Sequence, residues 1–407
     1  MENSFIKRFF VLFSGSIVGQ ALTVIFMPIF TRLYTPSDFG VFSFFMSLVF
    51  IMGIAINARY ELAIYLPPSL RESVSLAYLS FLINFVLSLL LLFFVLIFAQ
   101  DRVFYLLPIS IFLMGLSEVL ISLCIKVGKS NYLGIADIKR ALIMVIVTTL
   151  LGFLNWGYWG LILGRIIGQF TYVLFIFLKL KFLIKKYTPT LNELKLLAYR
   201  YRNFPKFSIF EGILDNVNNY IVVVFMKYMY SNSIAGYYGL ASRLLMLPIL
   251  FISRILQRLM VKEIVEREGS EKIKFLSFIT FTILILSAFI YCLLSMISTK
   301  LTIIFGERWL LAFLMLKYLS FLFFGRFIYV SLSSILISLE KQKIGFIQNM
   351  LLTLLYFAVF LLVYLRNYEV LKFIKYLTLV IGSLYLFQSF LIFYLFLKHM
   401  SNSKRVS

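Results

Sequence analysis

Long apolar runs alternate with short basic or turn-rich connectors along almost the whole 407-residue chain. A membrane-spanning helix needs about 20 apolar residues, and runs of that length recur from one end of the sequence to the other. The pattern predicts twelve helices, at residues 9–33, 39–66, 74–98, 104–126, 139–154, 157–182, 206–230, 234–258, 273–298, 311–339, 344–365 and 373–398. We therefore expect an all-α polytopic membrane protein.

Composition and charge support this interpretation and exclude other classes. Hydrophobic residues make up 62% of the chain and charged residues only 14%, which is too apolar for a soluble surface. The formal net charge of +22 is spread over the short connectors and forms no single patch, so no nucleic-acid partner is expected. With the N-terminus in the cytoplasm, the even-numbered connectors hold most of the Lys and Arg residues. The positive-inside rule then predicts that both termini are cytoplasmic.

Side chains for catalysis are scarce. Cys124 and Cys292 are the only cysteines and lie in apolar sequence, and His399 is the only histidine, so neither a disulfide framework, a metal site nor histidine catalysis is supported. No phosphate-binding loop and no nucleophile elbow is present. We expect a protein that is not an enzyme and has no cofactor. If it transports, an ion gradient, the membrane potential or a substrate gradient would drive it, with H⁺ or Na⁺ as the possible coupling ion.

The two halves of the chain resemble each other. LYTPSDFGVFSF in the first half aligns with MYSNSIAGYYGL in the second, which places Tyr34 on Tyr230 and Gly40 on Gly236. Six predicted spans separate the copies, and an even number gives both the same orientation in the membrane. The sequence therefore predicts two parallel six-helix bundles, at residues 1–184 and 206–398, with a cytoplasmic tail at 399–407.

The connector at residues 185–205 is expected to be a cytoplasmic amphipathic linker. Thr190 and Glu193 fit a capping box, which predicts a short helix. Four apolar residues share one face of this helix: Leu191, Leu194, Leu197 and Ala198. Three basic residues are expected to meet anionic lipid headgroups: Lys195, Arg200 and Arg202. An ordinary basic loop is the alternative.

The stretch FEGILDNVNNYIV puts Glu211 and Asp215 inside a predicted span. Their spacing of four places them on one helix face with two asparagines that follow, and charge at membrane depth needs a partner or a wet cavity. This face forms a structural ion pair or lines a transport pathway. The repeat pairs it with the first helix as follows: Gly15 with Glu211, Gly19 with Asp215 and Gln20 with Asn216. The glycines allow close helix packing or leave room for a ligand.

Further charged residues lie at or near membrane depth: Arg59, Glu61, Glu118, Arg165, Arg243, Arg254 and Arg326. Arginine outnumbers carboxylate, so a shared cavity would be positive, and the guanidinium binds phosphate with two parallel hydrogen bonds. Arg59 and Arg254 are alternatively expected to snorkel to a nearby interface. The predicted substrate-binding residues are Arg59, Arg165, Arg243, Arg326, Gln20 and Asn216. The predicted ion-coupling or ion-pair residues are Glu61, Glu118, Glu211 and Asp215.

Several motifs resemble those of a known family. SGSIVGQ, PIFTRLYTPSDFGVFSFFMSL and ARYELAIYLP, with the later YRNFPKFS and FGERW, are similar to bacterial O-antigen and capsular polysaccharide flippases. These are the Wzx-type members of the multidrug/oligosaccharidyl-lipid/polysaccharide exporter superfamily. The resemblance implies a MATE-like fold with two six-helix bundles around a central cationic cavity. Arg59 and Glu61 match the Arg-Tyr-Glu motif position of that family.

The resemblance also implies a function. It predicts a flippase of the bacterial inner membrane that moves undecaprenyl-pyrophosphate-linked oligosaccharide repeats by alternating access, for O-antigen or capsular polysaccharide biosynthesis. Expected partners are the lipid-linked substrate, membrane lipids, and the polysaccharide polymerase and chain-length proteins. A cation-coupled multidrug exporter is one alternative, which a positive cavity disfavours. A non-transporting membrane scaffold for polysaccharide enzymes is the other.

Overall fold

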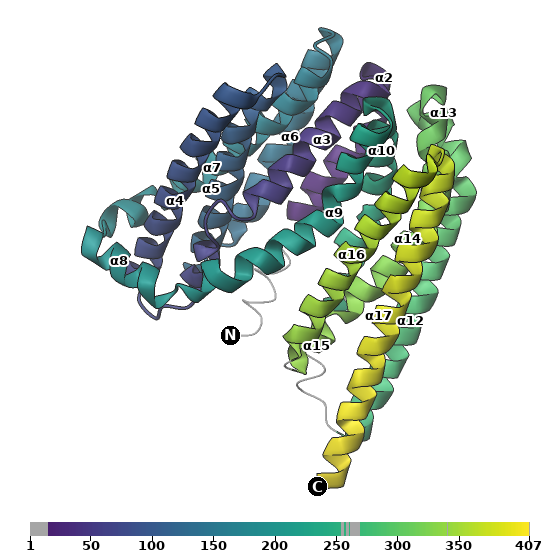
Figure 1. The fold of residues 1–407 in the computed structure, drawn as a ribbon. Helices are drawn as coiled ribbons and strands as arrows, with labels where there is room; N and C mark the ends of the chain where they lie inside the picture. Colours follow the sequence, from purple (N-terminus) through teal and green to yellow (C-terminus); the bar gives the residue numbers. More distant parts are fainter. Residues whose placement is uncertain (1–14, 254–255, 258–259, 261–268, 340, 407) are drawn as a thin grey trace. The chain divides into compact units, whose positions relative to one another are not determined.

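The computed structural model describes residues 15–253, 256–257, 260, 269–339 and 341–406. In this part of the chain the secondary structure is helical, without a strand (Figure 1). Eleven helical stretches among the described residues are long and apolar enough to cross a membrane. One more helix, α6 (Asn131–Phe153), is of spanning length but carries Asp137, Lys139 and Arg140 near its start. The prediction of an all-α, multi-span protein is confirmed.

The chain divides into two compact units, residues 1–224 and 225–407. The first unit contains, in chain order, the helical stretch Gly15–Leu33 with α2 (Met27–Leu33) at its end, α3 (Pro36–Gly53), η1 (Tyr60–Tyr65), α4 (Leu70–Phe98), η2 (Arg102–Leu106), α5 (Leu107–Lys126), α6, α7 (Tyr158–Lys186), α8 (Leu191–Arg200) and η3 (Phe204–Ser208). Within it α5 packs against α3, α4 and α7, and α6 packs against α7. Helix α9 (Ile209–Met229) begins in this unit and ends in the second.

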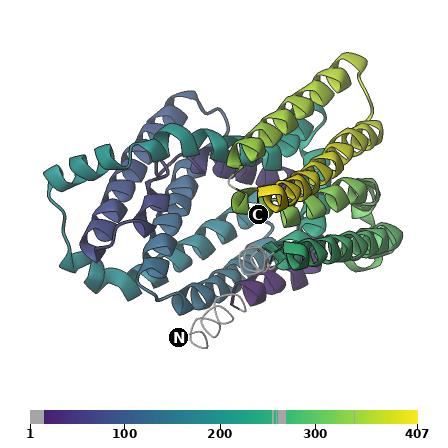
Figure 2. The ribbon, with the colours of Figure 1, turned by 90° about the horizontal axis from the view of Figure 1, so that it is seen from below.

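The second unit repeats this packing scheme. Its elements are α10 (Asn232–Pro248), η4 (Ile249–Ser253), α12 (Gly269–Ile297), η5 (Ser298–Leu301), α13 (Thr302–Phe305), η6 (Glu307–Trp309), α14 (Leu310–Leu332), α15 (Ser334–Ser338), α16 (Gln342–Arg366) and α17 (Val370–Val406). Here α14 packs against α10, α12 and α17, and α16 packs against α17. Figures 1 and 2 show α12, α14 and α17 side by side. Helix α14 thus occupies the position in its unit that α5 occupies in the first.

Each half of the repeat has an equivalent tyrosine hydrogen bond between two of its helices. The hydroxyl of Tyr34 donates to the backbone oxygen of Thr148, in α6, at 2.6 Å. The hydroxyl of Tyr230 donates to the backbone oxygen of Tyr368, just after α16, at 2.7 Å. Each bond therefore joins the end of the first helix of a half to its fifth helix. The residue after each tyrosine then caps the next helix through its side chain. The aligned positions of the sequence repeat have equivalent local geometry.

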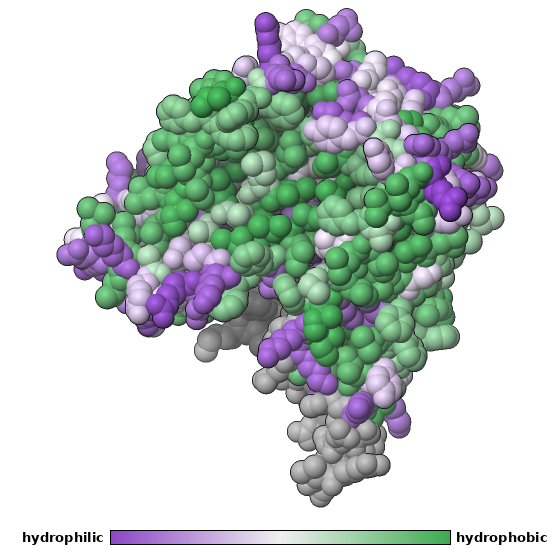
Figure 3. Space-filling view, in the orientation of Figure 1, coloured by the Kyte–Doolittle hydropathy of each residue, from purple (hydrophilic) through white to green (hydrophobic). Residues whose placement is uncertain are grey.

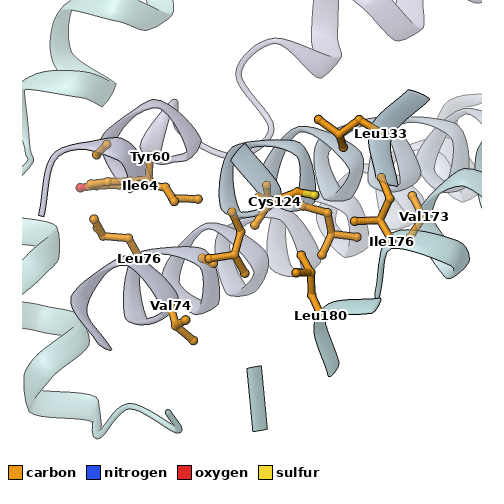
Figure 4. Packing of buried hydrophobic residues seen from close by; sticks show 14 of the residues in the cluster. Tyr60, Ile64, Val74, Leu76, Cys124, Leu133, Val173, Ile176 and Leu180 are labelled. Atoms are coloured by element: carbon orange, nitrogen blue, oxygen red, sulfur yellow. The ribbon is translucent and has the colours of Figure 1, made fainter. Parts of the chain in front are cut away.

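The core of the first unit is a hydrophobic cluster in which η1, α4, α5, α6 and α7 meet (Figure 4). Leu76 of α4, Leu123 of α5 and Ile176 of α7 are completely buried there. The outer side of α4 is different, because Phe94 and Ile97 are exposed. Such apolar surface is typical of a helix that faces lipid, and Figure 3 shows an extensive apolar face. The elements pack by their small and apolar inner faces and leave apolar outer faces for the bilayer.

Two predicted helix boundaries are wrong. The second predicted span, 39–66, ends as α3 at Gly53, and Tyr60, Ala63 and Ile64 after it are buried in the protein core. The fifth predicted span, 139–154, begins earlier, at Asn131, because Asp137 and Arg140 satisfy each other's charge inside α6. Apolarity alone cannot separate a lipid-facing segment from one buried in protein.

Three prolines lie inside spans, as the sequence predicts, and each is at the boundary between two helical segments of its span. Pro28 and Pro108 sit in the first turns of α2 and α5, where the missing amide donor costs nothing. Pro248 ends α10 and is followed by the π-helical η4. Each proline therefore marks a break between two helical segments of one span.

Candidate functional site

The segment between α3 and η1, which we call the corner, holds the Arg59 and Glu61 of the Arg-Tyr-Glu motif. Ala58 and Arg59 have φ angles of 48° and 61°, in the left-handed region. Such conformations cost about 1–3 kcal/mol each and persist where the surroundings hold them. The Nδ2 of Asn57 donates to the backbone oxygen of Gly115 at 2.8 Å, which fixes the corner against α5.

Arg59 and Glu61 form an ion pair, with 3.6 Å between the guanidinium Nη1 and the carboxylate Oε1. The other carboxylate oxygen of Glu61 and the Nε of Arg59 are buried without a partner among the described residues. Arg59 also lies against α9, since a Cβ on Gly212 would come within 3.2 Å of its Nη2. The corner therefore offers unsatisfied polar atoms to an ion or water.

The Glu61 carboxyl lies outside the spans, between Gly53 and Leu70. Burial raises its pKa from 4.5 to about 7, while its own backbone amide and Arg59 oppose the rise and Glu118 adds to it. Because only 4% of Glu61 is exposed, desolvation of the charged form outweighs the attraction to Arg59. A carboxyl with a pKa near 7 can gain or lose a proton at physiological pH.

A second ion pair lies on α6. The Nη2 of Arg140 is 2.6 Å from the Oδ1 of Asp137, and the hydroxyl of Ser16 donates to the Oδ2 at 2.5 Å. The Arg140 guanidinium also lies over the ring of Tyr172, 4.9 Å from its centre. Sequence reasoning missed Asp137 as a site residue, although the Asp-x-x-Arg spacing places both side chains on one helix face once α6 is extended to Asn131.

Glu118, on α5, connects these two ion pairs. It is close enough to Arg59 and Arg140 for both charges to act on it, and Glu61 also feels its charge. Five side chains thus form what we call the N-terminal charge cluster: Arg59, Glu61, Glu118, Asp137 and Arg140. The predicted residues Arg59, Glu61 and Glu118 are brought together, which the sequence did not indicate.

The acids of α9 lie on a different kind of surface. Glu211 and Asp215 are both exposed, and Asn219 donates to the Oδ2 of Asp215 at 3.4 Å. Asn218 is buried, so only part of the predicted polar face is accessible. The Nδ2 of Asn216 is occupied by the backbone oxygen of Gly212 at 3.0 Å. The face available for a ligand or a cation is therefore the acidic one.

The glycine face of the first helix is closely packed. A Cβ on Gly15 would lie 2.3 Å from the Cα of Gly134, and one on Gly19 would lie 2.9 Å from the backbone oxygen of Asp137. The two backbones therefore touch along this face, as small residues permit. Of the two alternatives for Gly15 and Gly19, close helix packing is confirmed, and room for a ligand is wrong.

The remaining predicted residues are buried or half-buried where the structure describes them. The Oε1 of Gln20 is buried without a partner among the described residues, and Arg165 is half-buried on α7. In the second unit Arg243 on α10 and Arg326 on α14 are half-buried. Arg254 lies outside the described residues.

Arg326 has an aromatic environment. Its guanidinium carbon is 5.7 Å from the centre of the Phe323 ring. Its charge also acts on three buried phenols from neighbouring helices: Tyr238, Tyr291 and Tyr356. Phenol oxygens and ring faces can stabilise a guanidinium without neutralising it.

Several solved structures of transporters and of a lipid flippase have the same fold as this chain. An inward-facing multidrug resistance MATE family transporter of the MOP superfamily matches with a TM-score of 0.72 and 13% identity, over 96% of this chain and 99% of that one. A MOP superfamily transporter from Pyrococcus furiosus matches with a TM-score of 0.64 and 13% identity, over 98% of this chain and 96% of that one. The lipid II flippase MurJ matches with a TM-score of 0.64 and 17% identity, over 94% and 86%. The predicted MATE-like fold is confirmed.

The family is identified from the sequence itself. No curated protein matches this chain. The family model described as polysaccharide biosynthesis protein matches residues 29–263, more than half of the chain. This protein is therefore a membrane-spanning member of the polysaccharide biosynthesis protein family, with the fold of the MATE and MurJ transporters.

Proposed function

We propose that this protein is a flippase that moves undecaprenyl-pyrophosphate-linked oligosaccharide repeats across the bacterial inner membrane by alternating access. The observation that carries the proposal is the match to the polysaccharide biosynthesis family in a chain with a MATE-like fold. A membrane protein of this family that is built as a transporter has a lipid-linked saccharide as its natural cargo. Transport without covalent chemistry also agrees with its scarcity of catalytic side chains.

The arginines would bind the pyrophosphate. A guanidinium presents two parallel N–H groups to a phosphate, and the contact is stronger in a partly buried site than in water. Arg326 suits this role because its neighbours are aromatic side chains. Arg165 and Arg243, also half-buried, are the other candidates. The polyprenyl chain would remain in lipid, which requires no polar contact from the protein.

The N-terminal charge cluster would couple transport to an ion gradient. Glu61 has a buried, unpartnered carboxylate oxygen and a pKa of about 7, and Glu118 lies close to it. Protonation of Glu61 would free Arg59 from its ion pair, and deprotonation would restore the pair. The exposed acids Glu211 and Asp215 provide a second place where H⁺ or Na⁺ could bind.

Deletion of the protein in its native host tests this function. The flippase proposal expects lipid-linked repeat units to accumulate on the cytoplasmic side and surface polysaccharide to be lost. Complementation with Arg326→Ala should fail at normal protein levels, whereas the exposed Lys300→Ala serves as a matched loss of one positive charge and should restore polysaccharide. Normal surface polysaccharide in the deletion strain, with no related flippase present, contradicts the proposal.

A cation-coupled multidrug exporter is the second candidate. The exposed carboxylates of Glu211 and Asp215 and the fold of a multidrug resistance transporter favour it. This candidate expects the deletion strain to become sensitive to lipophilic cations and to keep its polysaccharide. Susceptibility tests on the same deletion strain therefore separate the two functions.

The proposed location is the inner membrane, with both termini in the cytoplasm. Lys and Arg residues concentrate in the connectors on one side of the spans, which supports this orientation. Fusion of alkaline phosphatase to the C-terminus should give no activity, and fusion of a fluorescent protein that folds only in the cytoplasm should give a signal. The opposite pair of results contradicts the orientation.

A further inference from the structure

Helix α8 is fixed on the first unit by its inner side. Leu194 and Leu197 are buried, and the hydroxyl of Tyr60 donates to the backbone oxygen of Ala198 at 3.0 Å. The predicted capping box at Thr190 and Glu193 is present. The helix is therefore a rigid element rather than a loose connector.

Two ion pairs attach α8 to the start of α4. The Nη2 of Arg71 is 2.6 Å from the Oε1 of Glu193, and the Nη1 of Arg200 is 3.4 Å from the Oε2 of Glu72. Arg200 is thereby used for packing, although the sequence had suggested a contact with lipid headgroups. Both pairs agree with the orientation that the buried Leu194 and Leu197 give the helix.

The outer face of α8 combines apolar and basic side chains. Leu191, which the sequence places on one face with Leu194 and Leu197, is 75% exposed, and Leu196 and Tyr199 are each 68% exposed. The neighbouring basic residues Lys195, Arg202 and Lys206 are exposed as well. We call these six residues the α8 surface: Leu191, Lys195, Leu196, Tyr199, Arg202 and Lys206.

The cations of the α8 surface lie over aromatic rings. The Arg202 guanidinium is 4.3 Å from the centre of the Tyr199 ring, and the Lys206 ammonium is 5.5 Å from that of Phe207, which is itself exposed. A basic group next to an exposed ring is the arrangement that amphipathic segments use at the boundary between lipid tails and headgroups.

The segment around α8 is also rich in basic and exposed apolar residues. Residues 179–206 contain eight Lys or Arg residues and only one acidic residue, Glu193, which is paired with Arg71. Phe182, at the end of the α7 span, is 78% exposed. Figure 3 shows hydrophilic residues gathered where α8 lies in Figure 1, beside an apolar face. The α8 surface thus continues the lipid-facing flank of the spans into a strongly positive region.

We propose that the α8 surface binds the headgroups of anionic phospholipids in the same membrane. The exposed leucines would enter the boundary layer, and Lys195, Arg202 and Lys206 would each contact a lipid phosphate. Charge complementarity and continuity with the lipid-facing spans determine this occupant. The site is separate from the transported substrate and does not depend on the proposed function.

Lipid titration of the purified full-length protein tests the proposal. The thermal unfolding temperature is measured in neutral detergent with added phosphatidylglycerol or phosphatidylcholine of identical acyl chains. Phosphatidylglycerol should raise it at lower concentration than phosphatidylcholine does. In the triple variant K195Q/R202Q/K206Q, the concentration needed for half of the shift should increase, by about fivefold for each charge removed and on the order of 100-fold in total.

The control triple K274Q/K300Q/K317Q removes the same charge from exposed positions outside the α8 surface and should behave like the unmodified protein. If the first triple does not fold, K195R/K206R retains the charge and should keep the lipid preference. Equal responses of the two triples, or equal effects of the two lipids, overturn the proposal.

A fluorescent probe locates the contact. Cys292 is exposed and Cys124 is buried, so L196C in a C292S background gives one reactive thiol on the α8 surface. An environment-sensitive dye at this position should shift to the blue in nanodiscs that contain phosphatidylglycerol and should be quenched by brominated lipid. A dye that stays water-exposed in both lipids overturns the proposal, and a shift that requires cytosolic extract points to a protein partner instead.

Discussion

The first helix and α9 occupy equivalent positions in the two halves, yet their matching faces do opposite things. The face of the first helix carries Gly15 and Gly19 and lies in backbone contact with α6. The face of α9 carries Glu211 and Asp215, four residues apart as well, and is exposed. The same aligned positions of the repeat thus carry glycines that pack against a helix in the first half and exposed carboxylates in the second.

The difference shows which features a repeat preserves. The tyrosine bonds of Tyr34 and Tyr230 and the caps that follow them are the same in both halves, because they determine how the first helix ends and the next begins. The residue types on the matching faces of the first helix and α9 are not preserved. Three acids of the first half, Glu61, Glu118 and Asp137, belong instead to the N-terminal charge cluster, where Glu61 is buried.

The largest effect is expected from Gly15→Leu. Any side chain here meets the backbone of Gly134, which cannot move aside as a flexible side chain would. Destabilisation should exceed about 3 kcal/mol, and size-exclusion chromatography should show little monodisperse protein. Gly345→Ala is the control, since its Cβ would make only an ordinary contact of 3.7 Å with Leu336. A well-folded Gly15→Leu variant contradicts the packing of this face.

Glu61→Gln should change the pH dependence of stability. The pKa of Glu61 is raised in the folded protein, so between pH 4.5 and about 7 the folded state binds more protons than the unfolded state. Stability contributed by the neutral carboxyl is complete below pH 4.5 and decreases as pH rises to about 7. Glutamine stays neutral, so the Glu61→Gln variant does not lose this stability as pH rises. The difference in free energy of unfolding between the variant and the unmodified protein should therefore change by about 3 kcal/mol in favour of the variant between pH 4.5 and about 7.

Thermal unfolding of the Glu61→Gln variant and the unmodified protein across this pH range measures the difference in stability. Glu211→Gln makes the same substitution at the exposed acid of α9 and is the matched control. If Glu61→Gln instead loses stability at pH 8, the ion pair with Arg59 outweighs burial.

Arg140→Ala should cost about 2 kcal/mol, because it leaves the mostly buried Asp137 without its cation. Arg200→Ala removes an ion pair whose partners are largely exposed and should cost less than about 1 kcal/mol. Chemical denaturation of both variants gives the comparison. Removal of Asp137 as well should recover part of the Arg140→Ala loss, and equal costs at the two arginines would contradict the role of burial.

Tyr34→Phe and Tyr230→Phe should each cost about 1 kcal/mol, the value of one hydrogen bond to a backbone oxygen. Because the two bonds lie far apart in sequence and share no partner, the double variant should show the sum. The unfolding temperatures of the three variants test whether the repeat is equally anchored in both halves. A large cost at one tyrosine alone would show that the halves differ here too.

The smallest change in stability is expected from Glu211→Gln and Asp215→Asn, within about 0.5 kcal/mol, because both side chains are exposed. Transport should nevertheless lose its dependence on the ion gradient if these acids bind the coupling ion. Reconstituted vesicles with and without a proton or sodium gradient measure this. Lost folding with unchanged gradient dependence would leave only a structural role for the acidic face.

The sequence by itself determined what depends on neighbours along the chain. Apolar runs of spanning length, the repeat that pairs Tyr34 with Tyr230, and the capping box at Thr190 can be read directly from the sequence, and the structure has eleven such spans among its described residues, the paired tyrosine bonds and the cap. The acids of α9 also fall on one face, because helix periodicity fixes their relative direction.

The tertiary structure decided which side of each element is buried. Gly15 packs against Gly134, 119 residues further on, and Glu61 lies close to Glu118 of another helix. No periodicity reveals such neighbours, and it did not reveal that the apolar segment after Gly53 packs inside the protein or that Leu191 points outward. Hydrophobicity indicates that a side chain avoids water. Only the packed fold decides whether that side chain is buried in the protein core or faces lipid.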